Sequence, residues 1–509
     1  MRRAYLLHPD WNPDIERDLS VNDRNLLQDL ELDAMLRVMS GGDRHIRSVC
    51  RNVLLEGLDD PGIILYRQAI LRDALQNPEA VRHLYRLAGE ALETARRHPL
   101  SFLALTSPAS VLSSSLDLLG TLLDVLERMS GIARESGRRF RSRGFRDFLS
   151  IFKRELGPGS LSTLREHLHR LEEDAGWMVS IGLGPGNVAT GHTLRRPVRS
   201  RRHRWWHRIR EAARRILRRR PTVIRLRADP RDPGSNRTLE DIRHRAIGPV
   251  TNTLAQSAER ILATLRALQR ELAFYAGCVN LAEHLAGISQ PIAFPRVGEP
   301  GGRRHSFSGL YDVCLALTVD DDIVGNRVDA DGRDLVVITG ANQGGKTTFL
   351  RSVGVAQLMM QCGMFVPAES YCADPCTGIF THYRREEDVT MERGKLDEEL
   401  MRMNDIVEDA RPGALVLFNE SFAATNEREG SEIARQVVSG LVDSGVRVFF
   451  VTHLYEFARH VKATDDGHAL FLRAERRSDG TRTFRMIEGS PQATSHGMDL
   501  YERIFDDET

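Results

Sequence analysis

One short stretch, residues 335–348, constrains the fold of this chain more than any other. The apolar run Leu335–Thr339 predicts a buried strand, and the residues after it read Gly-Ala-Asn-Gln-Gly-Gly-Lys-Thr-Thr. This order matches the P-loop pattern G-x-x-x-x-G-K-[ST], and a helix-like segment follows it, as the pattern requires. Glycines let backbone N–H groups converge on phosphate oxygens at a helix N-terminus, where the helix dipole favours negative charge. The stretch therefore predicts a site for ATP or GTP.

The pattern predicts roles for two side chains of the loop and a phosphate-binding role for the loop as a whole. We expect Lys346 to reach the β- and γ-phosphates and the Thr347 hydroxyl to bind Mg²⁺. An ordinary glycine-rich turn is the alternative, and the strand and helix on either side argue against it. The predicted phosphate-binding residues are Gly340, Ala341, Asn342, Gln343, Gly344, Gly345, Lys346, Thr347 and Thr348.

Two further apolar runs end in polar residues. Residues 414–418 lead into Asn419 and Glu420, and residues 446–451 lead into Thr452 and His453. Buried parallel strands have this composition, and ligands collect at their carboxyl ends. We expect Glu420 to activate water and Asn419 to assist Mg²⁺ through its water shell. His453 would sense the γ-phosphate, although a histidine there can also be interpreted as a general base.

At this point the sequence resembles the MutS mismatch-repair ATPase family. Several motifs occur in the family's order: residues 340–348, Val366–Ala368, Ile379–Thr381, Asn419–Glu420 with Thr425 and Gly430, Phe450–His453 with Glu456, and Ser495–Asp499. The resemblance spans about residues 310–505 and implies an ABC-type ATPase that uses ATP and Mg²⁺. It also implies a homodimer in which each site is completed by the partner's signature loop.

The sequence departs from the family pattern at two places. Asn419 replaces the family's metal-binding Asp, so the metal site carries less charge. Within Met391–Lys395, Gly394 stands where the family's signature has a Ser that would touch the partner's γ-phosphate, although Arg393 or Lys395 would still supply charge. Slow or conditional hydrolysis is therefore expected.

The charge of the chain is concentrated in one segment. Residues 195–227 contain fifteen arginines and one glutamate, a net charge of +14, whereas the whole chain carries +1 and the remainder therefore −13. Trp205, Ile209, Ala212 and Ile216 fall on one face of a predicted helix within it. Such a segment favours a polyanionic partner. The predicted DNA-binding residues are Arg201, Arg202, Arg204, Arg208, Arg214, Arg215, Arg218 and Arg219.

This arginine segment has two alternative interpretations. A basic amphipathic helix with tryptophans also fits an anionic membrane surface, and a solvated loop without a ligand fits the composition too. The resemblance favours double-stranded or branched DNA, so we expect DNA rather than a membrane as the partner.

The predicted architecture combines an all-helical region with an α/β domain. We expect a helical lever region at 1–181, a short basic clamp-like insert at 182–238, returning lever helices at 239–300 and an ABC-type P-loop ATPase domain at 301–509. No Phe-x-Glu motif precedes the lever-like helices, so the family's mismatch-recognition and connector domains are expected to be absent. Six scattered cysteines and no signal-like N-terminus favour the cytoplasm.

The functional prediction follows from these parts. We expect a dimeric, ATP-dependent DNA-binding protein whose ATPase cycle opens and closes a DNA clamp, in DNA repair or recombination. The alternative is a nucleotide-gated scaffold that hardly hydrolyses ATP and engages a protein or an anionic membrane surface.

Overall fold

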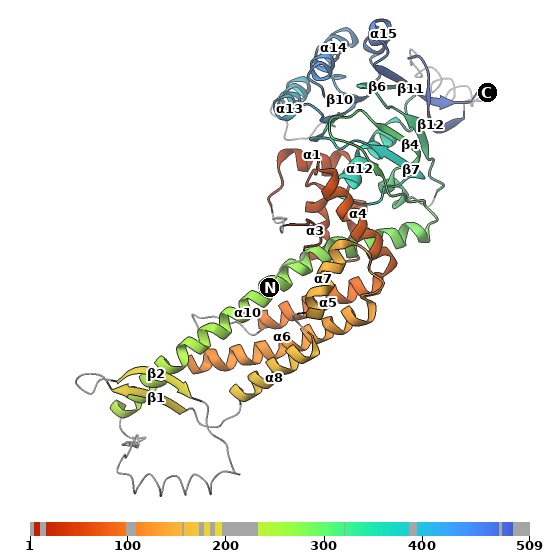
Figure 1. Ribbon diagram of the computed structural model, residues 1–509. Helices are drawn as coiled ribbons and strands as arrows, with labels where there is room; N and C mark the ends of the chain where they lie inside the picture. The colour runs from red at the N-terminus through yellow and green to blue at the C-terminus, as the bar shows by residue number, and fades with distance from the viewer. Residues whose placement is uncertain are drawn as a thin grey trace, which may run out of the picture. The chain divides into compact units, whose positions relative to one another are not determined.

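The computed structural model describes most of the chain, as residues 5–10, 17–97, 108–154, 157–172, 178–183, 189–195, 233–319, 321–385, 394–477 and 481–491. These residues form two compact units (Figure 1). The first comprises residues 1–85, 136–151 and 269–509, and the second comprises residues 86–135 and 152–268. The prediction of a helical region followed by an α/β region is confirmed, and the four predicted domain boundaries stay predictions.

A six-stranded sheet forms the centre of the α/β part. Its order is β12-β11-β6-β10-β9-β8, and every neighbouring pair is parallel except the antiparallel pair β11 and β12. The strands are β6 (Leu335–Thr339), β8 (Ile379–Tyr383), β9 (Leu415–Asn419), β10 (Arg447–Val451), β11 (Ala469–Arg476) and β12 (Arg482–Glu488). The inner strands have nearly continuous apolar sequences because helices cover both faces.

Helices pack on both faces of this sheet. On one face, α13 (Lys395–Asp409), α14 (Glu427–Asp443) and α15 (Tyr455–Thr464) contribute to a core with Val416, Phe418 and Phe450. On the other face lies α12 (Lys346–Gln361), where a side chain on Gly354 would come within 2.6 Å of Leu417 and 2.9 Å of Leu30. Gly354 thus lets α12 fit between the sheet and the N-terminal helices, and α12 is buried along nearly its whole length.

A smaller sheet and a short helix stand beside the large sheet. The strand order is β3-β7-β4-β5, with β3 (Arg296–Val297), β4 (His305–Leu310), β5 (Asn326–Asp329) and β7 (Ser370–Ala373). The short helix α11 (Val313–Ala316) follows β4 and is capped by Asp312, whose side chain accepts the N–H of Leu315 at 3.1 Å.

N-terminal helices complete the first unit. They are α1 (Val21–Asp29), α2 (Asp33–Ser40), α3 (Arg44–Leu54), α4 (Pro61–Gln76), the start of α5 (Pro78–Arg97), most of α7 (Arg143–Arg154) and the end of α10 (Pro233–Gly287). Helix α1 lies against the edge strand β8, where Asn22 Nδ2 donates to the carbonyl oxygen of Ile379 at 2.9 Å. Glu31, at φ +50°, lies in the turn that separates α1 from α2.

The second unit contains the remaining helical segments. Leu112 and Leu116 of α6 (Pro108–Ser136) pack with Leu168 of α8 (Pro158–Glu172) and with Leu254 of α10. Strands β1 (Met178–Leu183) and β2 (Ala189–Arg195) pair antiparallel, and β2 lies within the predicted insert at 182–238. None of the helices in the described ranges has the length and apolar character needed to cross a bilayer.

Candidate functional site

The glycine-rich loop connects β6 to α12 at the carboxyl edge of the large sheet. Gly340 has φ +127°, and a Cβ atom there would lie 2.9 Å from the backbone nitrogen of Ala474 on β11. Gly345 has φ +86° and caps the N-terminus of α12. Both positions need glycine, the first for space and both for backbone conformation. The loop therefore leaves the N–H groups at the start of α12 facing the space above the sheet.

Lys346 is the first residue of α12, and its side chain folds back over the loop. Its Nζ donates to the carbonyl oxygens of Gly340 and Ala341, each at 2.9 Å. Burial lowers the pKa of Lys346 to about 8, although the charge of Glu420 opposes this change. Two backbone carbonyls are its acceptors here, and an anionic ligand would satisfy a buried ammonium better.

The polar ends of three adjacent strands meet beside the loop. Strand β10 lies between β6 and β9, and the parallel register aligns Val451 with both Ile338 and Asn419. The Thr347 hydroxyl, predicted to bind Mg²⁺, donates to Oδ1 of Asn419, predicted to assist the ion, at 3.0 Å. His453 Nε2 lies 3.1 Å from Glu420 Oε1. This hydrogen bond is the main reason that the pKa of Glu420 lies below its usual value.

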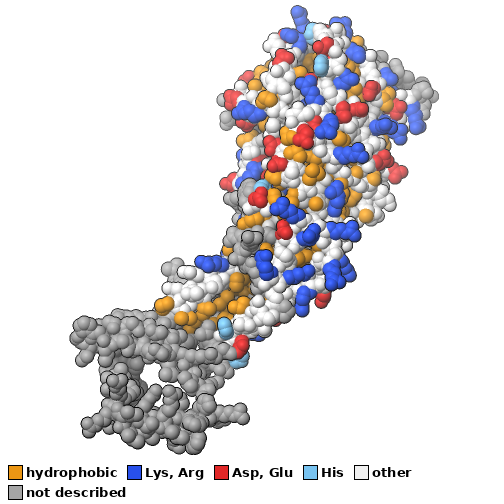
Figure 2. Space-filling model, viewed as in Figure 1, with side chains coloured by type: hydrophobic (Ala, Val, Ile, Leu, Met, Phe, Trp, Pro, Cys, Tyr) orange, Lys and Arg blue, Asp and Glu red, His pale blue; other side chains and the backbone are white. Residues whose placement is uncertain are grey.

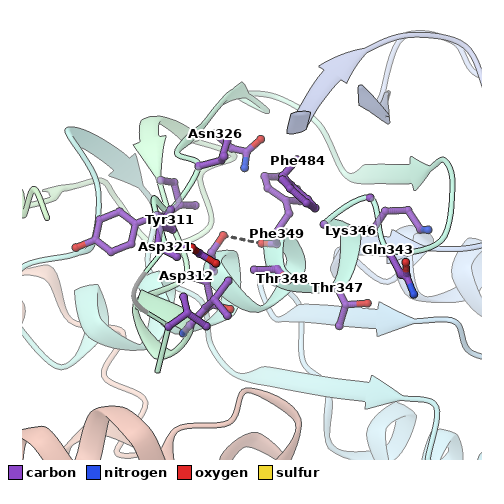
Figure 3. Close-up of a pocket in the computed structure, with 18 of the residues that line it drawn as sticks. Tyr311, Asp312, Asp321, Asn326, Gln343, Lys346, Thr347, Thr348, Phe349 and Phe484 are labelled. Carbon is purple, nitrogen blue, oxygen red and sulfur yellow. Dashed lines mark hydrogen bonds between the residues drawn. The ribbon is translucent and has the colours of Figure 1, made fainter. Parts of the chain in front are cut away.

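A pocket of about 410 Å³ lies above these groups. One wall is the loop, from Asn342 to Thr348, together with Glu420. In Figure 3, Gln343, Lys346 and Thr347 stand on one side and Tyr311, Asp312 and Asp321 on the other, with Phe484 between them. The pocket thus has a polar end at the loop and a mixed wall opposite it.

The far wall of the pocket comes from segments that the sequence did not single out. Phe484 of β12 has φ +56° and is 49% exposed, so an aromatic ring is presented to the pocket. Arg482 on the same strand donates to Gln343 Oε1 at 2.8 Å. The N–H of Met486 donates to Asn326 Oδ1 at 2.7 Å, which ties β12 to the small sheet. No local sequence signal identifies these residues, because strand pairing alone brings them to the loop.

The predicted site residues thus divide into two groups. The loop residues, Asn419, Glu420 and His453 lie together, and their roles stay predictions. The eight predicted DNA-binding arginines, from Arg201 to Arg219, lie outside the described residues. On the face drawn in Figure 2, the described basic and acidic side chains are intermixed.

Comparison with protein families decides what kind of protein carries this site. The MutS2 N-terminal domain matches residues 59–288, and MutS domain V matches residues 336–505. The chain belongs to the MutS family. The second match begins within β6 and covers the loop, Asn419, Glu420 and His453. The resemblance predicted from the motifs is therefore confirmed.

Curated relatives match parts of the chain. The DNA mismatch repair protein MutS of Chloroflexus aurantiacus is 30% identical over 184 residues, which cover 33% of this chain and 19% of that protein. The DNA mismatch repair protein MutS 2 of Halobacterium salinarum is 25% identical over 262 residues, covering 51% of this chain and 29% of that protein. The endonuclease MutS2 of Carboxydothermus hydrogenoformans is 29% identical over 177 residues, covering 34% of this chain and 22% of that protein. This chain spans less than a third of these relatives.

Proposed function

We propose that this MutS-family chain is a Mg²⁺-dependent ATPase of the P-loop, ABC type, which couples its nucleotide state to DNA binding. The observation that carries this proposal is the meeting of Lys346, the Thr347–Asn419 pair and the Glu420–His453 pair at one edge of a parallel sheet. Lysine, hydroxyl, amide and carboxylate groups are the set that phosphoryl transfer from ATP requires.

The residues fit both a nucleotide and a metal ion. A Cβ atom on Gly340 or Gly344 would come within about 3 Å of neighbouring protein atoms, so the loop keeps this conformation only with glycine at these positions. The Thr347 hydroxyl and the Asn419 amide oxygen are hard oxygen donors of the kind that Mg²⁺ prefers. Bound Mg²⁺ would neutralise charge on the β- and γ-phosphates. The exposed ring of Phe484 offers an apolar surface for the base.

Each side chain then has a distinct task in hydrolysis. When ATP binds, its phosphate oxygens replace the carbonyl oxygens of Gly340 and Ala341 as hydrogen-bond acceptors for Lys346. Glu420, kept ionised by His453, orients a water molecule and accepts its proton as the water oxygen bonds to the γ-phosphorus and the bond to the bridging oxygen breaks. His453, which lies 3.1 Å from Glu420, orients the carboxylate and senses the γ-phosphate.

DNA binding and dimerisation complete the proposed cycle. The arginine segment at residues 195–227 supports a DNA backbone contact whose affinity falls with salt. The family membership supports a homodimer whose ATPase domains face each other and whose levers clamp duplex or branched DNA. DNA repair or recombination is the process that this combination suits.

The decisive experiment compares ATP turnover by the wild-type chain and Glu420→Gln, with and without duplex or branched DNA, at low and moderate salt. Glutamine keeps the shape of Glu420 but cannot take a proton, so turnover should fall by about 10²–10⁴-fold while ATP binding persists. Lys346→Ala is the matched binding control, and it should lose ATP affinity itself. Wild-type ATP binding without turnover under every condition would overturn the ATPase proposal.

One observation supports a second candidate function. The residue beside Thr347 is the uncharged Asn419, so the metal site is weaker than an aspartate would make it. A nucleotide-gated scaffold that binds ATP and engages a protein or anionic membrane surface would have such a site. Replacing Arg214, Arg215, Arg218 and Arg219 with glutamine separates the two functions. Loss of a salt-dependent DNA affinity supports the first, and unchanged DNA binding with lost lipid binding supports the second.

A further inference from the structure

The backbone directly after β9 has an unusual conformation. Glu420 has φ +55° and Phe422 has φ +63°, so two non-glycine residues separated by Ser421 adopt the left-handed region. Such residues cost about 1–3 kcal/mol each, and they persist where the surrounding contacts determine them. We call residues 420–422 the elbow. It presents the Glu420 carboxylate to the pocket.

Three different elements hold the elbow through hydrogen bonds. The N–H of Glu420 donates to the carbonyl oxygen of Val451 on β10 at 2.9 Å. The Ser421 hydroxyl donates to the carbonyl oxygen of His382 on β8 at 2.6 Å. The N–H of Phe422 donates to Glu399 Oε2 on α13 at 3.0 Å. Each residue of the elbow is thus fixed from a different side.

The contact between Glu399 and Phe422 is deeply buried. The exposed fractions are 8% for Glu399 and 0% for Phe422, so water does not replace either partner. An unsatisfied N–H in such a place costs about 1–3 kcal/mol. Burial raises the pKa of Glu399, and its bond to the Phe422 N–H opposes that rise. Phe422 lies beyond the end of β9 at Asn419, and its N–H is satisfied by the side chain of Glu399.

Packing around Phe422 also fixes the elbow. The imidazole of His382 stacks on the Phe422 ring at a centroid distance of 5.6 Å and an interplanar angle of 24°. His382 Nε2 donates to the carbonyl oxygen of Glu399 at 2.9 Å, which links β8 to the start of α13. A Cβ atom on Gly430 would lie 2.4 Å from the Phe422 carbonyl oxygen, so α14 closes the remaining side.

We propose that Glu399 is a positioning residue for Glu420, because its carboxylate holds the Phe422 N–H and so fixes the elbow that carries the catalytic carboxylate. Glu399 does not line the pocket, and it acts only through the backbone. The proposal rests on the proposed ATPase function. It predicts that nucleotide binding is independent of Glu399, since the loop and Lys346 do not contact it in the described structure.

The test compares Glu399→Ala with Glu399→Gln. Alanine removes the acceptor, whereas the amide oxygen of glutamine can still accept from Phe422. We expect Glu399→Ala to lower kcat by about 10- to 100-fold, because small misplacements of a catalytic group have effects of this size. Its ATP Kd should stay within about twofold, and Glu399→Gln should keep kcat within about threefold of wild type. Asp405→Ala, which removes an exposed acid from the same helix, is the matched control.

A second measurement does not depend on turnover. Hydrogen–deuterium exchange over a peptide containing the elbow should become faster in Glu399→Ala and stay slow in Glu399→Gln and Asp405→Ala. Unchanged kcat and exchange in Glu399→Ala, or equal slowing of kcat by both Glu399 variants, would overturn the proposal. If wild type and Glu420→Gln both lack turnover, the ATPase function fails, and the exchange measurement still decides whether Glu399 holds the elbow.

Discussion

Arg351, in the middle of α12, pairs with two carboxylates of very different exposure. Its Nε donates to Asp312, whose side chain is 0% exposed, and its Nη1 lies 2.5 Å from Glu31, whose side chain is 67% exposed. The Arg351 side chain itself is 9% exposed. Arg351→Met keeps the aliphatic length of the side chain and removes the charge, so it isolates the electrostatic contribution.

The expected magnitudes follow from these exposures. Removing one partner of a buried ion pair leaves an uncompensated charge, here Asp312, and typically costs about 3–5 kcal/mol. The Glu31 carboxylate is exposed and keeps its hydration when the pair is broken, and pairs at the surface contribute about 0–1 kcal/mol. Arg351→Met should therefore destabilise the chain by about 3–5 kcal/mol, and Glu31→Gln by no more than about 1 kcal/mol.

Urea unfolding followed by circular dichroism measures these differences, with all variants analysed at one common m-value. The double variant Arg351→Met with Asp312→Asn removes both charges, and the amide oxygen can still accept the Leu315 N–H that caps α11. The double variant should therefore regain most of the free energy of unfolding that Arg351→Met loses. The reasoning is refuted if Glu31→Gln costs as much as Arg351→Met, or if the double variant is no more stable than the single one.

Three further predictions concern the loop, the metal site and the N-terminal segment. Because the pKa of Lys346 is lowered to about 8, the ammonium is lost as the pH rises through that value, so ATP affinity measured by calorimetry should fall above about pH 8. Lys346→Ala should abolish this dependence. Asn419→Asp should tighten Mg²⁺ binding by about 2 kcal/mol, from one added charge about 4 Å from the ion in a water-like dielectric, and the Mg²⁺ dependence of turnover reports it. Tyr275→Phe removes the buried donor to the Leu6 carbonyl oxygen, 2.6 Å away, and should cost about 1–3 kcal/mol in urea unfolding.

The first wall of the pocket could be predicted from sequence because its signals are local. An apolar run predicts each of β6, β9 and β10, and the spacing of glycines with Lys346 predicts the loop. The proximity of Glu420 and His453 follows once β9 and β10 are neighbours, since parallel strands end at the same edge. The order of the strands itself has no local signal, because it is set by packing across the whole sheet.

The far wall of the pocket could not be predicted, because it too depends on packing between segments that are distant in sequence. Tyr311 and Asn326 belong to the small sheet and its connections, whereas Phe484 belongs to an edge strand that lies more than 150 residues away in sequence. Two features bring these segments to the loop. One is the register between β11 and β12, and the other is the hydrogen bond from the Met486 N–H to Asn326.

The elbow shows why local rules fail at the site itself. Left-handed backbone angles favour glycine, yet Glu420 and Phe422 carry them. Glycine would remove the strain at the first position, but it would also remove the carboxylate that lines the pocket. At the second position it would remove a ring packed against His382 and Phe418. The strain is therefore a consequence of placing a carboxylate that lines the pocket at a sharp turn. The buried acceptor that offsets it, Glu399, comes from a helix that precedes β9.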